Sequence, residues 1–205
     1  TPIHSAISVR NLEAAAELLK LGADLNQPSL ICQIDDRSPE CNLLTPVAGA
    51  MNGWGEAWSP FESPADHDDF FARVLPWCLE RGARLDTRDC RGNTVLHQSW
   101  LAHEDGSCVA RLLAGGAPVN AVNAEGKTPL KVFTERLAEA YRDGEVKGKP
   151  PECIQNLLAA GADPTRADRL GRTPLDDMRE VGWSQMVAVL EKGVTPAMSP
   201  RRSRP

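Results

Sequence analysis

The side chains in this sequence that could do chemistry are few, and their spacing does not bring them together. Four histidines and six cysteines are spread over 205 residues, and no two cysteines form the C-x-x-C pair typical of zinc sites and disulfide exchange. The run Asp66-His67-Asp68-Asp69 contains metal-ligand residue types. Consecutive residues point in different directions around a helix, however, and acidic residues favour a helix start. We therefore predict no metal site and no cofactor.

Catalytic motifs are absent as well. The sequence has no G-x-x-x-x-G-K-[ST] phosphate loop, no G-x-G-x-x-G, no G-x-S-x-G elbow and no H-E-x-x-H. Cys32 and Cys41 flank a short polar stretch; they would bridge in a secreted protein and stay reduced in a cytosolic one. We expect a protein without enzymatic activity, located in the cytoplasm, with nuclear or host-cell delivery as open alternatives.

The charge balance bears on the class of partner. The chain has 28 acidic and 23 basic side chains, a net charge of −5, and three of its arginines crowd the last five positions. Such an acidic body is a poor electrostatic match for phosphate backbones or anionic lipid surfaces. No apolar run approaches the roughly 20 residues that cross a bilayer. We therefore expect a globular chain, monomeric alone, that binds neither nucleic acid nor membrane.

Two sequence markers recur in phase along the chain, which indicates internal repeats. The first is a tetrad of the type Thr-Pro-Leu-His, whose copies begin at residues 1, 45, 94, 128 and 173. The second is an apolar pair shortly before Gly-Ala, with its glycine at residues 22, 82, 116 and 161 and a degenerate copy ending at Gly193. From glycine to threonine the step is 12 residues at 82→94, 116→128 and 161→173.

Each marker has a structural meaning. Threonine caps a helix, and proline suits its first position. The apolar residues three, four and seven places before each glycine line one face of a second helix, and the glycine provides a left-handed cap. A single helix pair cannot cover its own apolar stripe, so neighbouring pairs must stack into a solenoid.

The tetrad, a period of about 33 residues and the hairpin pattern D/N-x-x-G-x-T at 89–94, 123–128 and 168–173 resemble the ankyrin repeat. The resemblance implies an all-α fold, an ankyrin-repeat solenoid of helix-turn-helix units joined by β-hairpin-like loops. A single domain spans 1–194, with five units at about 1–26, 45–86, 94–120, 128–165 and 173–193. Insertions fall at about 27–44, 52–65 and 140–151, and residues 195–205 form a basic tail rich in Ser, Pro and Arg.

Local departures from the pattern give further expectations. The insertion at 27–44 replaces the first hairpin and is expected to be an ordered or semi-ordered loop. Pro76 should kink the second helix of unit two or end its first turn. The first helix of unit four should run long, from Pro129 to Arg142, and Trp183 should pack at the end of the stack.

The resemblance implies that the histidine of the tetrad, present as His4 and His97, stabilises the turn through hydrogen bonds. Three units replace this histidine by Ala48, Lys131 and Asp176. Those units are expected to be less tightly tied to their neighbours.

The resemblance implies that hairpin tips and first helices line a concave surface that binds another protein. Family positions that vary with the partner correspond here to Arg88, Cys90, Arg91, Asn93, Glu125, Lys127, Glu135, Arg136, Arg169, Leu170 and Arg172. Arginines among scattered acids suggest a partner with complementary carboxylates. Trp54 and Trp58 are either exposed anchors for a partner or rings that cover a gap in the stack. Asn26 and Asn120 occupy the position that asparaginyl hydroxylases modify in some ankyrin proteins.

The predicted function is a protein–protein interaction module, an adaptor or scaffold without chemistry of its own. The alternative is the recognition domain of a larger enzyme or secreted effector whose catalytic part lies outside this chain. The heavy insertions and a chain that starts at Thr1 rather than at methionine motivate the alternative.

Overall fold

The computed structural model describes residues 1–27, 29–32, 41–44, 47, 70–99, 106–146 and 148–193, and the structural statements below concern these residues. Trp54, Trp58, the insertion at 52–65, the Asp66–Asp69 run and the tail at 195–205 lie outside them. No helix among the described residues is long and apolar enough to cross a membrane.

Paired helices dominate the structure, as the repeat pattern predicts. In chain order the elements are α1 (Pro2–Ser8), α2 (Leu12–Lys20), β1 (Ser29–Cys32), β2 (Cys41–Leu44), η1 (Phe70–Val74), α5 (Leu75–Glu80), α6 (Val95–Gln98), α7 (Ser107–Ala114), α8 (Pro129–Arg142), α9 (Glu152–Ala159), α10 (Pro174–Glu180) and α11 (Ser184–Gly193).

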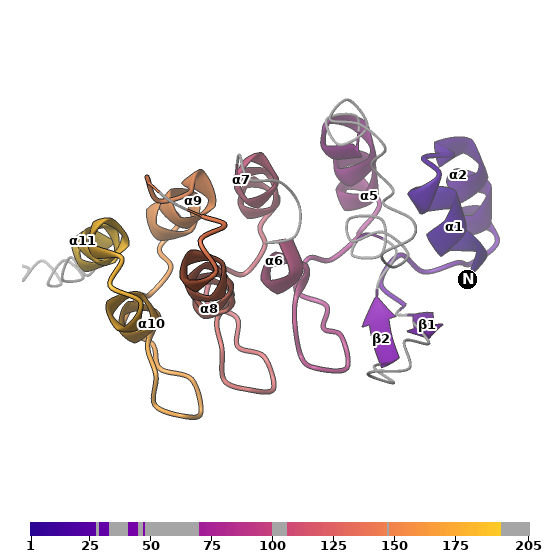
Figure 1. Cartoon of the computed structure of the whole chain (residues 1–205). Helices are drawn as coiled ribbons and strands as arrows, with labels where there is room; N and C mark the ends of the chain where they lie inside the picture. The colour runs from indigo at the N-terminus through magenta and orange to yellow at the C-terminus, as the bar shows by residue number, and fades with distance from the viewer. Residues whose placement is uncertain are drawn as a thin grey trace, which may run out of the picture.

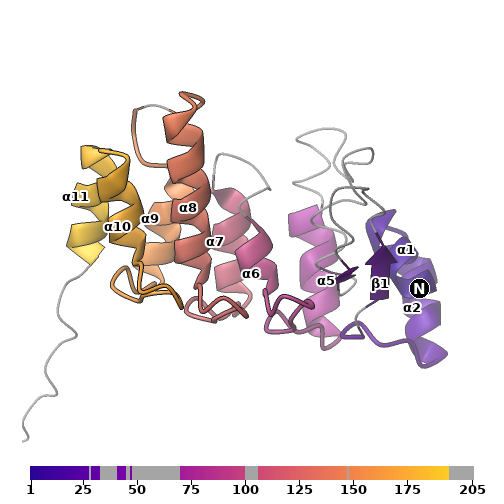
Figure 2. The same cartoon turned by 60° about the horizontal axis from the view of Figure 1, so that its bottom comes forward.

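The helices of units three to five form two rows, shown in Figure 1 and from a second direction in Figure 2. The first helices α6, α8 and α10 pack on one another in one row, and the second helices α7, α9 and α11 pack in the other. The hairpin loops project on the side of the first helices. This stacked arrangement confirms the predicted fold class.

The core lies between the rows. Leu112 of α7 and Leu157 of α9, four places before their glycines, are completely buried, and so are Val109 and Ile154 to within 1%. The leucines three places before the glycines are only partly buried. The prediction of an apolar stripe is therefore confirmed. Its residues four and seven places before these glycines are the ones buried between the two rows of helices.

The last glycine marker is out of register with the others. Gly116 and Gly161 follow α7 and α9 with φ of 88°, which is the predicted left-handed cap. Gly193, in contrast, is the last residue of α11. A Cβ added there would meet Leu158 Cδ2 at 2.8 Å, so this glycine permits a close helix contact. The prediction of a capping glycine at this position is wrong.

Pro76 lies where the helix type changes. Residues 70–74 form the wide π-type turn η1, and α5 starts at Leu75 with Pro76 in its first turn. Proline lacks an N–H and clashes with the carbonyl four residues earlier in a regular helix. A wider turn before Pro76 relieves that clash, so the predicted disturbance of this helix is confirmed.

The first insertion contains a two-stranded antiparallel sheet. The backbone of β1 pairs with that of β2 in a register that sets Leu30 opposite Leu43 and Cys32 opposite Cys41. We expected an ordered or semi-ordered loop at 27–44, and the structure adds these strands. Short apolar runs on both sides of a polar stretch favour such a hairpin. The loop-forming residues of this segment, on which our prediction rested, did not indicate the strands.

The insertion in unit four extends its first helix. Helix α8 runs from Pro129 to Arg142, as predicted, and Figure 2 shows it standing above its neighbours. The ring of Tyr141 near its end stacks on Trp183, with centroids 4.7 Å apart. Trp183 is 2% exposed, and its indole N–H donates to the Gly148 carbonyl at 3.2 Å. Trp183 therefore holds the long helix and its return loop against unit five.

Candidate functional site

Each regular hairpin tip is closed by its first side chain. We call residues 89–93, 123–127 and 168–172 tips three, four and five, after the units they precede. In tip five, Asp168 Oδ1 accepts hydrogen bonds from the backbone N–H groups of Leu170 at 2.8 Å and Arg172 at 3.0 Å. Asp89 and Asn123 make the equivalent bonds in the other two tips. These first side chains are therefore turned into their own loops.

The tips stack on one another through main-chain hydrogen bonds. The Ala124 N–H donates to the Arg91 carbonyl at 2.8 Å, and the Arg169 N–H donates to the Glu125 carbonyl at 3.1 Å. The Asn123 amide donates to the Asn93 side-chain oxygen at 2.9 Å. The three tips therefore form one continuous row along the edge of the molecule.

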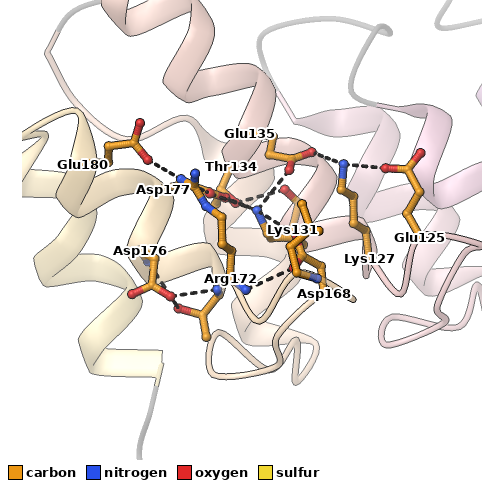
Figure 3. Close-up of polar contacts among 12 residues, drawn as sticks. Glu125, Lys127, Lys131, Thr134, Glu135, Asp168, Arg172, Asp176, Asp177 and Glu180 are labelled. Atoms are coloured by element: carbon orange, nitrogen blue, oxygen red, sulfur yellow. Dashed lines mark hydrogen bonds and ion pairs between the residues drawn. The ribbon is translucent and has the colours of Figure 1, made fainter.

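A ladder of ion pairs crosses the first helices of units four and five (Figure 3). The sign of the charge alternates at every step of this charge ladder, which runs Glu125, Lys127, Glu135, Lys131, Asp177, Arg172, Glu180, Arg142. Its members come from tips four and five and from helices α8 and α10. The ladder therefore joins two units through side chains alone.

Lys131 lies at the buried centre of the ladder. Its Nζ is 2.7 Å and 2.9 Å from the two carboxylate oxygens of Asp177, 3.1 Å from Glu135 and 3.6 Å from Asp168 Oδ2. Thr134 Oγ1 donates to the Asp177 carboxylate at 3.0 Å. The side chain of Lys131 is 0% exposed and that of Asp177 is 3% exposed. Buried charges are tolerated when they are paired and hydrogen-bonded in this way.

Three carboxylates in or beside the charge ladder, those of Glu125, Asp168 and Glu180, have lowered pKa values. Burial alone would raise the pKa of Asp168, but the backbone N–H groups of Arg172 and Leu170, with the Lys131 ammonium, outweigh it and lower the pKa. Hydrogen bonding to Lys127 lowers the pKa of Glu125. Groups of this kind are ionised near neutral pH and are unsuited to donate protons there. The arrangement can attract and position charged groups.

His97 shows what the tetrad histidine does in this chain. Its Nδ1 accepts a hydrogen bond from the Thr94 N–H at 3.0 Å, and its Nε2 lies 3.1 Å from the Lys127 carbonyl in the next tip. Burial lowers the pKa of His97, which fits a neutral ring that accepts at Nδ1 and donates from Nε2. The turn-stabilising role is therefore confirmed, and the ring also ties unit three to unit four.

Lys131 takes over this role at the same position of unit four. It reaches the next tip through Asp168 and the next first helix through Asp177. The expectation that a unit without the histidine is less tightly tied is therefore wrong for Lys131. Asp176, which replaces the histidine in unit five, caps its own helix by accepting from the Thr173 N–H at 2.8 Å.

Several residues predicted to contact a partner are engaged inside the protein instead. Glu125, Lys127, Glu135 and Arg172 belong to the charge ladder, and Asn93 connects tips three and four. The Arg88 guanidinium donates to the carbonyls of Gly92, at 2.9 Å, and Val122. These residues shape and stiffen the surface.

Other predicted residues face outward from the row of tips. Cys90, Arg91, Arg169 and Leu170 are exposed, Leu170 to 83% of its surface. Arg136 is exposed as well and pairs with Glu139 on α8 at 3.2 Å. The structure thus separates the predicted set into an internal group and an outward group, a distinction that sequence spacing did not make.

The predicted contact residues did not include four members of the charge ladder, Lys131, Arg142, Asp177 and Glu180, or the two residues that contact it, Thr134 and Asp168. The available signal was a lysine at the tetrad position where units one and three have a buried histidine. A buried ammonium requires carboxylates nearby, and aspartates follow at the equivalent tip and helix of the next unit.

Cys78 is buried and Cys153 is half-buried, and the loss of solvent makes both thiols unreactive. Burial raises the pKa of Cys78 to about 12 and that of Cys153 to about 11. Since the thiolate is the nucleophilic form, these two side chains serve packing.

Asn26 and Asn120 clamp successive units together. Asn120 Nδ2 donates to the Gly161 carbonyl at 2.8 Å, and its Oδ1 accepts from the Asp163 N–H at 3.0 Å. Asn26 makes the same pair of bonds to unit two, across the first and second insertions. We call this arrangement the amide clamp. Hydroxylation of these asparagines stays a prediction, and any such modification would act on a side chain that joins units.

The clamp is missing between units two and three for a chemical reason. Asp86 stands at the position of the clamping asparagine and lacks an N–H donor, and it pairs with Arg84 at 2.8 Å. Pro118 stands where Asp163 supplies its backbone N–H, and proline has none. Both halves of the clamp are therefore absent together.

We predict that Asn120→Asp lowers the free energy of unfolding by about 1 kcal/mol, because the Gly161 carbonyl loses its donor. Asp86→Asn is the matched control and should change stability by less than about 0.5 kcal/mol, since Pro118 cannot complete a clamp. Urea denaturation of both variants measures the difference. Equal stability of Asn120→Asp and the unchanged protein would show that the clamp does not hold units together.

Comparisons with known proteins agree with the helix pairs. Residues 1–30 match the family model described as Ankyrin repeat. A curated ankyrin repeat domain-containing protein from Stachybotrys chartarum (strain CBS 109288 / IBT 7711) is 26% identical over 153 residues. This similarity covers 71% of the present chain and 7% of that relative, so the chain corresponds to a small part of the relative's length.

Proposed function

We propose that this chain, an array of ankyrin repeats by its stacked helix pairs and its family match, is an adaptor or scaffold that binds another protein. Ankyrin repeats are in general protein-binding modules. The observation that carries the proposal is the row of stacked tips, whose outward side chains stand on a base held by main-chain hydrogen bonds and ion pairs. A surface fixed before binding loses little conformational entropy when a partner docks.

The two groups of side chains have different tasks in this proposal. The charge ladder and the amide clamp set the spacing of the units, while Arg91, Arg169 and Leu170 contact the partner. Arginine suits such contacts because its planar guanidinium binds carboxylates in a bidentate manner. We infer that the module acts by binding alone, since the sequence lacks the catalytic motifs sought above, and that the cytoplasm is its compartment.

We predict that Arg91→Ala combined with Arg169→Ala weakens partner capture about tenfold and leaves the melting temperature within about 2 °C of the unchanged protein. Both side chains are exposed on the tips. The control is Arg111→Ala with Lys192→Ala, which removes the same charge from helices α7 and α11 of the other row. Quantitative affinity capture with mass spectrometry compares the three proteins. A partner lost equally with both double variants would place its binding site elsewhere.

A second candidate is the recognition part of a larger enzyme or effector. The observation in its favour is the length of the curated relative, of which the similar segment is only 7%. The parent gene decides between the two: an open reading frame that encodes a catalytic domain in the same chain supports this candidate, and one without such a domain rules it out.

A further inference from the structure

The two strands of the first insertion place two cysteines directly opposite each other. The backbone of β1 pairs with that of β2 in an antiparallel register in which Cys32 is the partner of Cys41. Directly opposite residues of an antiparallel pair have Cα atoms about 4.5–5.5 Å apart, and a disulfide requires about 4.4–6.8 Å. The register therefore satisfies the backbone requirement for a bond between these two residues.

The alternation of faces along a strand makes this pairing selective. Successive residues of a strand lie on opposite faces of the sheet, so two residues can be bridged only when they share a face. Cys32 and Cys41 share a face because they are direct partners. Asn42, next along the chain, is the partner of Ile31 and lies on the other face. The strands thus add a condition that the spacing of the two cysteines in the sequence does not contain.

Most of the other cysteines are shielded from a soluble oxidant. Cys78 and Cys108 are completely buried. Burial raises the pKa of Cys153 to about 11, so little of it is thiolate near neutral pH. Cys90 on tip three is exposed. Cys90 is therefore the competing thiol that a test must control.

The sheet is too small to hold its register firmly by main-chain bonds alone. Each strand has four residues, and an isolated two-stranded hairpin is at best marginally stable in water. Figure 1 shows the strands on the side of the molecule where the hairpin loops project. A covalent bond between their ends would hold this small sheet together.

We propose that Cys32 and Cys41 form a reversible disulfide by exchange with glutathione disulfide. The thiolate of one cysteine attacks glutathione disulfide, releases one glutathione thiolate and leaves a mixed disulfide on the protein. The second cysteine thiolate attacks the protein sulfur of that mixed disulfide and releases the other glutathione thiolate. The two protein thiols lose two protons and two electrons, and glutathione disulfide takes up both to become two molecules of glutathione.

The state of the bond follows the redox state of the glutathione pool. In a reducing pool both cysteines stay thiols, and in an oxidising pool the bond closes a ring of ten residues from Cys32 to Cys41. The closed ring ties β1 to β2. This inference stands on the strand register and does not depend on the proposed partner binding.

The test uses the full chain in glutathione buffers of graded oxidation, with free thiols then blocked by N-ethylmaleimide. Trypsin cleaves after Lys20, Arg37 and Arg73, so the two cysteines fall on separate peptides, 21–37 and 38–73. Mass spectrometry of the monomer band from a gel run without reductant detects the bond as a linked peptide pair. We expect this pair to exceed every other disulfide at least about tenfold, and Cys90→Ser to change its yield less than about twofold.

A shifted cysteine separates the strand register from simple closeness in the sequence. Cys41→Ser combined with Asn42→Cys keeps two thiols at nearly the same spacing but places them on opposite faces of the sheet. The yield of the linked pair should fall at least about tenfold. In the unchanged protein, oxidation should slow amide hydrogen exchange at 29–32 at least about fivefold. Thermal melts show that each variant is folded.

Four results would overturn the proposal: glutathione adducts on both cysteines without the linked pair, linkage of either cysteine to Cys90, equal yields from the unchanged and the shifted protein, or unchanged hydrogen exchange at 29–32 after oxidation. None of these measurements involves a partner protein or the arginines of the tips. Failure here is therefore distinguishable from failure of the proposed function.

Discussion

Replacing Lys131 by methionine is expected to lower the free energy of unfolding by about 3–5 kcal/mol, the largest single effect we predict. Methionine fills the space of the lysine stem but removes the ammonium. The carboxylate of Asp168 then remains buried without its cation, and that of Asp177 keeps only Arg172, at 3.3 Å. Denaturation in guanidinium chloride, followed by circular dichroism and extrapolated to water, measures the loss.

A double variant separates the ion pair from the packing. Lys131→Met together with Asp177→Leu removes both charges and should recover at least about 2 kcal/mol relative to Lys131→Met alone, since a buried pair is often replaced by apolar residues at little cost. Lys131→His, which restores the family tetrad, should also destabilise, because a neutral imidazole is too short to serve both Asp177 and Asp168. A stability of Lys131→Met within about 1 kcal/mol of the unchanged protein would show that the ladder does not hold units four and five together.

The second large effect is expected for Gly106→Ala at the start of α7. Gly106 has φ of 68°, and a Cβ there would lie 2.5 Å from the backbone nitrogen of Cys153 on α9. The left-handed conformation costs about 1–2 kcal/mol with a side chain, and forcing two backbones apart costs about 1–3 kcal/mol more. The Gly106 carbonyl also accepts a hydrogen bond from Asn156 at 3.0 Å, so this bond would be strained as well.

Gly116→Ala is the matched control for the steric part of that cost. Gly116 has φ of 88°, and a Cβ there would meet nothing within 4 Å, so only the conformational cost applies. Differential scanning calorimetry of both variants should therefore show a clearly larger drop in melting temperature for Gly106→Ala. Equal drops would mean that α7 and α9 can separate at this point without penalty.

The architecture was predictable from the sequence because the markers of the repeats recur at a regular spacing. Threonine, proline and glycine act locally, so the long helix from Pro129 to Arg142 and the disturbance at Pro76 followed from neighbouring residues. The strands at 29–32 and 41–44 were missed because the family pattern has no counterpart there. The register of Gly193 was misjudged because the last copy is degenerate.

The candidate site was predictable only in outline. Sequence position placed Arg169 and Arg172 on the same tip, yet Leu170 and Arg169 face outward while Arg172 turns to Asp177 and Glu180. Which way a long side chain turns depends on partners in another unit. Lys131 and Asp177 are 46 residues apart, and a single sequence does not show that such a pair meets.

The alternation of sign along the charge ladder restricts how this surface can change during evolution. Every interior member has a neighbour of opposite charge on each side, so reversing one charge creates two repulsive contacts at once. Substitutions that preserve the ladder must therefore exchange two neighbouring charges together, or remove a charge at one of the two ends, Glu125 or Arg142. The contact surface around the ladder can diversify residue by residue, while the scaffold beneath it changes only in concert.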